Sequence, residues 1–239
     1  MKNNLILVEE NKTQIIKVLT FFFFFIAFVE VFSEFKENVL LQTITKPLLL
    51  PLLFFIYIFE ARRTSFLYII ALFLNWLANI FFISKNIDFI LIASFLFLLS
   101  RVLIIIKTCR DVKLTSCFPV IIASIPFMFF FLYLIYLIFN NTTTITFLIL
   151  IFQSLLMTIL GGYALGNYVM KNNYSSKMLM LSSICFGINL FVLGVKFYYL
   201  DLTFLKPISM VFFIGGHLAF LKFVLLSENE QTHKDSFIL

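Results

Sequence analysis

A small set of strongly polar residues stands inside the long apolar runs of this sequence: Lys46, Asn75, Asn79, Arg101, Gln153, Asn189 and His217. Polar groups are costly in apolar surroundings and usually have a structural or functional reason there. Glu30 and Glu60 lie near the ends of apolar runs, so we expect both to reach water. No Asp or Glu occurs at the middle of a run, so the candidates for chemistry are amides and basic groups.

The two basic candidates have different settings. Arg101 lies deep in its apolar run, where its long stem either carries the charge to the cytoplasmic surface or turns it inward. An inward guanidinium would suit a phosphate, which its planar fork binds through two hydrogen bonds. Lys46 opens a run ahead of Pro47 and Pro51, and either holds an anionic headgroup or anchors a helix end.

The imidazole and the amides also allow two interpretations each. His217 follows Gly215 and Gly216, which permit close helix approach, so it is either a hydrogen-bonded core residue or a general acid or base. Asn75 and Asn79 are four residues apart and share one helix face, which should look into the protein. Such amides either join helices through hydrogen bonds or line a site.

Other chemical motifs are missing from the sequence. There is no G-x-S-x-G, no H-E-x-x-H and no phosphate loop. Cys109, Cys117 and Cys185 form no paired pattern and no metal-binding spacing. We therefore expect no metal and no cofactor.

The elements that must position these residues are transmembrane helices. Hydrophobic residues make up 62% of the chain, and the mean hydropathy is +1.06. A span needs about 20 mostly apolar residues. The sequence predicts an all-α integral membrane bundle of about eight such helices, at roughly 14–32, 39–59, 64–83, 87–107, 118–139, 144–170, 177–198 and 205–226. Residues 14–226 then form the transmembrane domain, between polar tails at 1–13 and 227–239.

The basic residues predict the orientation. Of the 18 Lys and Arg residues, twelve fall on the side of the N-terminus, five on the opposite side, and Arg101 within a span. The positive-inside rule then puts both termini in the cytoplasm. The net charge of +6 is thus explained by topology and lipid headgroups, not by a nucleic-acid partner. We expect a multi-pass protein of the bacterial inner membrane.

The order of segments and polar residues resembles the YhhN family of eight-helix membrane proteins, which includes the lysoplasmalogenases. The stretch Thr45-Lys46-Pro47-Leu48, with Pro51, is similar to the Lys-Pro-Leu opening of the family's second helix. Leu74 to Asn79 aligns with the family's Ser-x-x-Gly-Asp, so that Asn75 and Asn79 stand at the Ser and Asp positions.

The resemblance continues through the later segments and covers nearly the whole length. Ala93 to Arg101 falls on the family's Gly-x-x-x-Phe-x-x-x-His, with Arg101 at the His position. Asn189 stands at the Asp of a Ser-Asp pair and is followed at the right distance by Lys196-Phe197. His217 stands at the Gln of an Ala-Gln pair.

The resemblance implies hydrolysis of the vinyl ether bond of a lysoplasmalogen, which yields a fatty aldehyde and a glycerophospho-base. Both family aspartates are replaced, by Asn79 and Asn189, so the two-carboxylate mechanism is lost. We expect His217 to act as general acid, with Asn79 and Asn189 orienting water. The lysophospholipid would be bound by Arg101, Lys46 and Asn75.

Two alternatives remain open. The chain is either such a hydrolase or an inactive lipid-binding protein of the same fold. A small-solute transporter is the second alternative. The sequence lacks the strong halfway repeat and the intramembrane carboxylates that would favour it.

Overall fold

The computed structural model describes residues 2–84, 86–114 and 116–236, with side chains placed from 10 to 230 apart from those two gaps. Met1 and residues 237–239 of the predicted tails lie outside the described residues, as does Lys85 of the charge count. Within the described ranges the chain is helical and contains no strand, which confirms the all-α fold class. The helices are α1 (Lys2–Phe35), α2 (Val39–Glu60), α3 (Phe66–Phe81), α4 (Ile87–Asp111), α5 (Phe118–Ile138), α6 (Thr144–Lys171), α7 (Tyr174–Tyr198) and α8 (Leu205–Ser236), with a 3-10 turn η1 (Phe139–Asn141) after α5.

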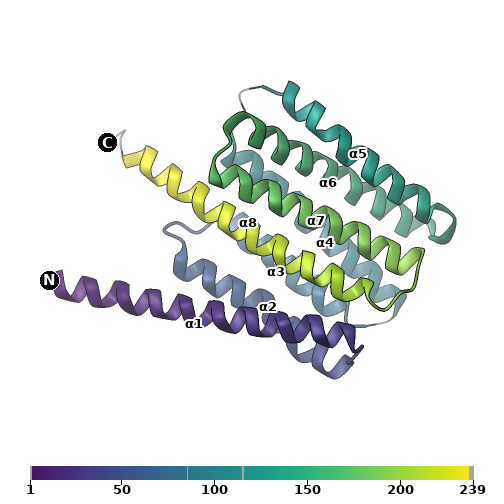
Figure 1. The fold of residues 1–239 in the computed structure, drawn as a ribbon, viewed down its shortest axis with the longest axis horizontal. Helices are drawn as coiled ribbons and strands as arrows, with labels where there is room; N and C mark the ends of the chain where they lie inside the picture. Colours follow the sequence, from purple (N-terminus) through teal and green to yellow (C-terminus); the bar gives the residue numbers. More distant parts are fainter. Residues whose placement is uncertain (1, 85, 115, 237–239) are drawn as a thin grey trace.

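Polar residues begin several of these helices. The side chains of Asn38, Asn86, Thr143 and Asn173 each accept a hydrogen bond from a backbone N–H in the first turn of α2, α4, α6 and α7. The chain reverses after α1 at Glu37, which adopts a left-handed backbone with φ 51°. Short connections of this kind make consecutive helices run antiparallel (Figure 1).

Two helices extend beyond the spans that the sequence predicts. α1 begins at Lys2 and α8 continues to Ser236, so most of both polar tails is helical. The fall in hydropathy marks where the apolar run ends, but a helix can continue through polar residues because its backbone bonds are internal. The helix α3 is instead shorter than its predicted span.

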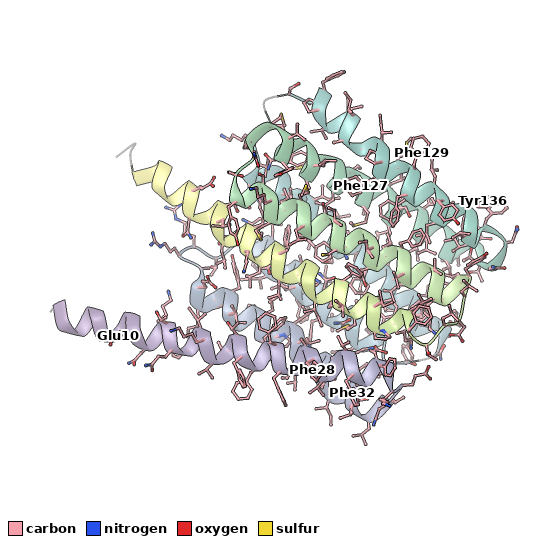
Figure 2. All side chains as sticks on the ribbon, in the orientation of Figure 1. Glu10, Phe28, Phe32, Phe127, Phe129 and Tyr136 are labelled. Carbon is pink, nitrogen blue, oxygen red and sulfur yellow. The ribbon has the colours of Figure 1, made fainter. Side chains whose placement is uncertain are left out.

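Seven of the helices in the described residues are long and apolar enough to cross a bilayer. The exception is α3, whose 16 residues extend only about 24 Å, against a hydrocarbon core of about 30 Å. Large apolar side chains lie on the outside, among them Phe28 and Phe32 of α1 and Phe129 and Tyr136 of α5 (Figure 2). Such a surface suits lipid rather than water, and the chain is a multi-pass integral membrane protein.

The bundle is built from packed neighbours. α1 packs on α2, α3 on α4, α5 on α6, and α7 on both α6 and α8, while α8 also closes against α1. Both described ends of the chain lie at the same end of the bundle (Figure 1). The turns α1–α2, α3–α4 and α7–α8 therefore meet at the opposite end.

Glycines permit close approach between α5 and α6. A Cβ added to Gly166 would lie 3.0 Å from the Cα of Val120, and one added to Gly162 would overlap Ser124. A four-residue spacing of small residues, as between Gly162 and Gly166, is typical of such close helix packing. Gly216 similarly lets α8 approach Phe186 of α7.

A tryptophan ties α3 to the start of α2. Pro51 has no N–H, so the carbonyl of Pro47 lacks its usual partner one turn later. The indole N–H of Trp76 donates to that carbonyl at 2.9 Å. The bond fixes α3 beside Lys46, which precedes Pro47.

Candidate functional site

Two small adjoining cavities lie near the end of the bundle where the turns α1–α2, α3–α4 and α7–α8 meet. The polar lining of the first, here the Arg101 cavity, includes Arg101, Gln153 and Asn189. The polar lining of the second, the Glu34 cavity, consists of Glu34, Lys46, Asn79, Asn189, Lys206 and Ser209. Each has a volume of about 40 Å³, which is room for a few water molecules and not for a lipid headgroup.

Aromatic side chains and one amide line both cavities. Phe82, Phe97 and Phe197 belong to both linings, and so does Asn189. The ring of Phe82 is stacked on Phe197, with centroids 5.9 Å apart, and lies 5.3 Å from Phe97. These rings form a shared wall, so their movement would join the two spaces.

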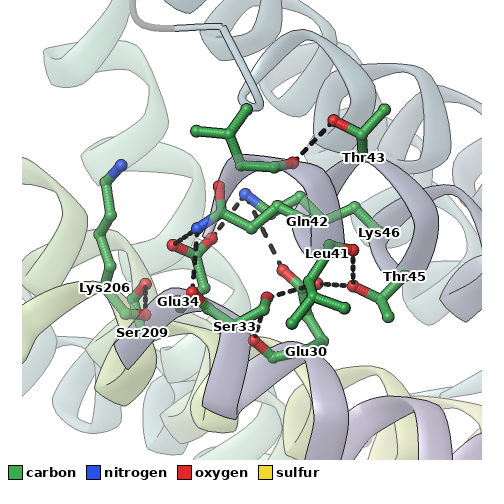
Figure 3. A network of polar contacts seen from close by, with 11 residues as sticks. Glu30, Ser33, Glu34, Leu41, Gln42, Thr43, Thr45, Lys46, Lys206 and Ser209 are labelled. Atoms are coloured by element: carbon green, nitrogen blue, oxygen red, sulfur yellow. Dashed lines mark hydrogen bonds and ion pairs between the residues drawn. The ribbon is translucent and has the colours of Figure 1, made fainter. Parts of the chain in front are cut away.

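The α1–α2 turn brings two carboxylates to Lys46. The ammonium of Lys46 lies 2.6 Å from Glu34 Oε1 and 3.9 Å from Glu30 Oε1 (Figure 3). Gln42 Nε2 donates to the other oxygen of Glu34 at 3.0 Å. The expectation that Glu30 reaches water is wrong, because its side chain is 0% exposed. It lies against α2, where Thr45 donates to its Oε2, and Ser33 donates to the same oxygen at 3.2 Å.

Sequence reasoning missed these acids as site residues. Glu30 and Glu34 are four residues apart on α1, and Gln42 and Lys46 are four apart on α2. Two such pairs on either side of a short turn face each other when the helices are antiparallel, and that spacing is the signal that could have found them. The argument against a transporter from missing intramembrane carboxylates also no longer holds.

Arg101 faces inward and does not reach the surface. Its side chain belongs to a residue only 5% exposed, and its guanidinium carbon lies 3.9 Å from the centre of the Phe186 ring. Among the described residues, Nη1 has no hydrogen-bond partner and no carboxylate pairs with the guanidinium. A cation–π contact favours this position, but it leaves the positive charge without an anion.

Two of the asparagines that the sequence singles out, Asn79 and Asn189, both line the Glu34 cavity. Asn79 reaches it from the end of α3 and Asn189 from α7. The amide nitrogen of Asn79 is buried and has no hydrogen-bond partner among the described residues. Gln153 of α6 donates to the carbonyl of Ser94 at 2.6 Å and so joins α6 to α4. The structure thus brings together Lys46, Asn79, Arg101 and Asn189.

Two predicted site residues lie outside both cavities. Asn75 donates to Ser100 Oγ at 2.5 Å, which is an α3–α4 contact, and to the carbonyl of Ala71 in its own helix. His217 is 1% exposed and packs between Phe186 and Phe213, with ring centroids 5.0 and 4.5 Å away. Neither ring nitrogen of His217 has a hydrogen-bond partner in the described part of the chain.

A second buried charge cluster lies at the end of the bundle near the termini. Lys107 pairs with Asp111 at 2.9 Å and with Glu228 at 3.2 Å, and Tyr57 donates to Glu228 at 2.9 Å. These contacts join α2, α4 and α8. None of the three charged residues lines either of the two cavities.

No metal site is found among the described residues: no group of three His, Cys, Asp or Glu could hold an ion there. Comparison with known proteins gives no match, whether to a protein-family model, to a curated protein or to a solved structure.

Proposed function

We propose that the protein takes a lysophospholipid from the bilayer into the joined cavities and hydrolyses the vinyl ether bond of lysoplasmalogens. The products are a fatty aldehyde and a glycerophospho-base. The observation that carries the proposal is the buried guanidinium of Arg101, which lines a cavity and has no anionic partner in the part of the chain that the structure describes.

A buried charge is costly unless an opposite charge and hydrogen bonds accompany it. A lipid phosphate would supply both, through the two parallel hydrogen bonds that a guanidinium forms with two phosphate oxygens. The ring of Phe186 covers one face of the guanidinium, and Arg101 belongs to the lining of the cavity. Because the cavity lies within membrane-spanning helices, the phosphate of a membrane lipid is the anion with the most direct access to it.

The reaction is the part of the proposal that rests on the YhhN resemblance. Its support in the structure is that Asn79 and Asn189 share a cavity with a carboxylate, that of Glu34. The vinyl ether carbon is separated from the phosphate only by the glycerol backbone, so adjoining cavities suit the two groups. Phe82, Phe97 and Phe197 must move to admit the lipid, since neither cavity holds it as it stands.

The proposal includes the orientation in the membrane. All eight helices would cross the bilayer, α3 included, with both termini in the cytoplasm of a bacterial inner membrane. The bias of Lys and Arg toward the N-terminal side supports this. An even number of crossings requires both ends of the chain to lie at the same end of the bundle, and both described ends do so (Figure 1).

The test is release of aldehyde from lysoplasmenyl-ethanolamine by the purified protein in lipid nanodiscs. We expect release by the natural protein and a loss of tenfold or more in Arg101→Gln, because a hydrogen bond to a charged group contributes about 1.5–3 kcal/mol. Arg62→Gln is the matched control, since Arg62 is exposed at the α2–α3 turn, and should behave like the natural protein. Absence of aldehyde from the natural protein would contradict the proposed reaction.

An inactive lipid-binding protein is the second candidate, and the amides at both Asp positions favour it. It predicts that the natural protein binds the lysolipid without turnover and that Arg101→Gln weakens this binding. Aldehyde release by Asn79→Asp/Asn189→Asp alone would show a preserved pocket whose chemistry was lost.

A further inference from the structure

We infer that Glu34 and Lys46 are the acid–base pair that moves the proton in this reaction, in the role that the sequence assigns to His217. The inference rests on the proposed function and adds its catalytic residues. Both side chains line the Glu34 cavity with Asn79 and Asn189, whereas His217 lines neither cavity.

Two contacts, one on each carboxylate oxygen, hold Glu34 in one geometry. Glu34 Oε1 lies 2.6 Å from Lys46 Nζ, and Glu34 Oε2 accepts from Gln42. Glu34 and Lys46 are each only 4% exposed, so bulk water does not compete for the proton between them. A catalytic group must be held in this way near its substrate, and one side of each residue faces the cavity.

The group formed by Glu30, Glu34 and Lys46 contains one carboxylate more than an ion pair between α1 and α2 requires. One carboxylate would neutralise Lys46, yet Glu30 lies 3.9 Å from the same ammonium and is fully buried. With all three groups ionised these side chains carry a net negative charge, and Lys206 brings a second ammonium group to the lining of the same cavity. The second carboxylate leaves an acceptor beside a positively charged transition state even while Glu34 is paired with Lys46.

A second observation points to a ligand in this cavity. The amide nitrogen of Asn79 is buried, lines the cavity and has no hydrogen-bond partner among the described residues. It is placed to donate to an oxygen of the substrate or of the attacking water. Asn189, which lines both cavities, lies between this point and Arg101.

The pair can carry out the proton steps without any other reagent. The proton shared by Glu34 and Lys46 adds to the alkene carbon remote from oxygen, the double bond becomes a single bond, and the positive charge moves to the carbon–oxygen unit. Water then adds to the oxygen-bearing carbon and returns one proton to the pair. The resulting hemiacetal breaks its bond to the glycerol oxygen, giving the aldehyde and a free glycerol hydroxyl, so one water is consumed.

The distribution of charge fits these steps. The oxocarbenium-like intermediate forms beside the carboxylate of Glu34, which lines this cavity and is paired with the ammonium of Lys46. Arg101, which would oppose a nearby cation, belongs to the other cavity, where the lipid phosphate neutralises it. The phosphate site and the carboxylate thus lie in separate cavities.

The test is aldehyde release and lysolipid binding by Glu34→Gln, with Glu60→Gln as the matched control, because Glu60 is exposed at the end of α2. We expect Glu34→Gln to lower turnover by about 10²–10⁴-fold, the usual contribution of general acid–base catalysis, and to flatten its pH profile. Binding of the lysolipid should change by less than about threefold, and Glu60→Gln should match the natural protein.

A double variant separates catalysis from helix linkage. Glu34→Gln/Lys46→Gln removes both charges and keeps two amides that can hydrogen-bond between α1 and α2. We expect it to be folded, as judged by its thermal midpoint, and inactive. Turnover restored in the double variant, or unchanged in Glu34→Gln, would overturn the inference while leaving the proposed function intact. Absence of aldehyde from the natural protein would instead refute the reaction and the inference together.

Discussion

Lys46 and Arg101 are both buried basic residues, but only one has carboxylate partners. Lys46 is surrounded by Glu34, Glu30 and the end of α2, whereas Arg101 contacts the Phe186 ring and forms no ion pair among the described residues. Removing one member of a buried ion pair leaves an uncompensated charge, while removing an unpaired charge relieves a cost. The two residues should therefore respond in opposite ways to the same substitution.

Arg101→Met should raise the free energy of unfolding of the lipid-free protein by about 1 kcal/mol or more, whereas Lys46→Met should lower it by about 3–5 kcal/mol. Thermal unfolding in detergent, with and without lysophospholipid, measures both effects. Added lysolipid should stabilise the natural protein and not Arg101→Met. A lower midpoint for Arg101→Met without lipid would show that an anionic partner already accompanies the guanidinium.

The two asparagines of α3 also differ in role, although they share a helix face. Asn75→Ala removes the bond to Ser100 and should cost about 1 kcal/mol of stability without changing the Kd for lysolipid. Asn79→Ala removes a nitrogen that has no hydrogen-bond partner among the placed side chains and backbone, so it should leave stability nearly unchanged and weaken binding. Measuring the unfolding midpoint and Kd for both variants tests this; equal behaviour would contradict the separation.

His217 is enclosed by aromatic rings, and neither of its nitrogens finds a partner among the described residues. A buried polar group without partners is unfavourable, so an apolar residue of similar size should be tolerated. His217→Leu should keep the unfolding midpoint or raise it, and should retain aldehyde release. Loss of turnover in a folded His217→Leu protein would return the role of general acid to this residue.

At the scale of the elements, close contact between α5 and α6 shapes the half of the bundle that carries Gln153. Gly166 faces backbone atoms of Val120, which cannot move aside as the end of a side chain could. Gly187 of α7 instead faces the tip of the Phe131 ring at an ordinary 3.5 Å from an added Cβ. An alanine at position 166 therefore meets rigid backbone, whereas an alanine at position 187 makes an ordinary van der Waals contact.

Gly166→Ala should destabilise the protein by about 1–3 kcal/mol through overpacking. Gly187→Ala, its matched control, should be neutral or stabilising by up to about 1 kcal/mol because alanine favours helix over glycine. Thermal unfolding midpoints in one detergent compare them directly. Equal losses in the two variants would show that helix flexibility, not the α5–α6 contact, determines the outcome.

At the scale of the whole molecule, charge is concentrated toward the two ends of the bundle. The Glu34–Lys46 group lies near the α1–α2 turn, and Lys107 with Asp111 and Glu228 lies at the end where the termini are found. The outward surface between them is rich in phenylalanine (Figure 2). This arrangement fits a bundle whose ends lie near the headgroups on either side of the bilayer.

The proposed topology can be tested by labelling cysteines with a membrane-impermeant maleimide in cells. Cys109 and Cys117 are exposed at the end near the termini and should react only after permeabilisation. Asn140→Cys, in a background of Cys109→Ser/Cys117→Ser, is exposed in η1 at the opposite end and should react in intact cells. The reverse pattern would place the termini outside.

The sequence by itself determined the membrane class and the positions of most helices, because hydropathy is a sum over contiguous residues. It also led to Lys46, Asn79, Arg101 and Asn189, since strongly polar residues are conspicuous in apolar runs. It did not reveal which helices continue beyond the apolar runs, as with α1 and α8.

Only the tertiary structure decided how the polar residues are partnered. It buried Glu30, paired Glu34 with Lys46 and enclosed His217 among rings, and it gave Arg101 no anion within the described ranges. The physical reason is that lipid and protein core are both apolar, so hydropathy does not show which face of a membrane helix turns inward. That choice depends on the rotation and register of every helix against its neighbours, which the packing of the whole bundle sets.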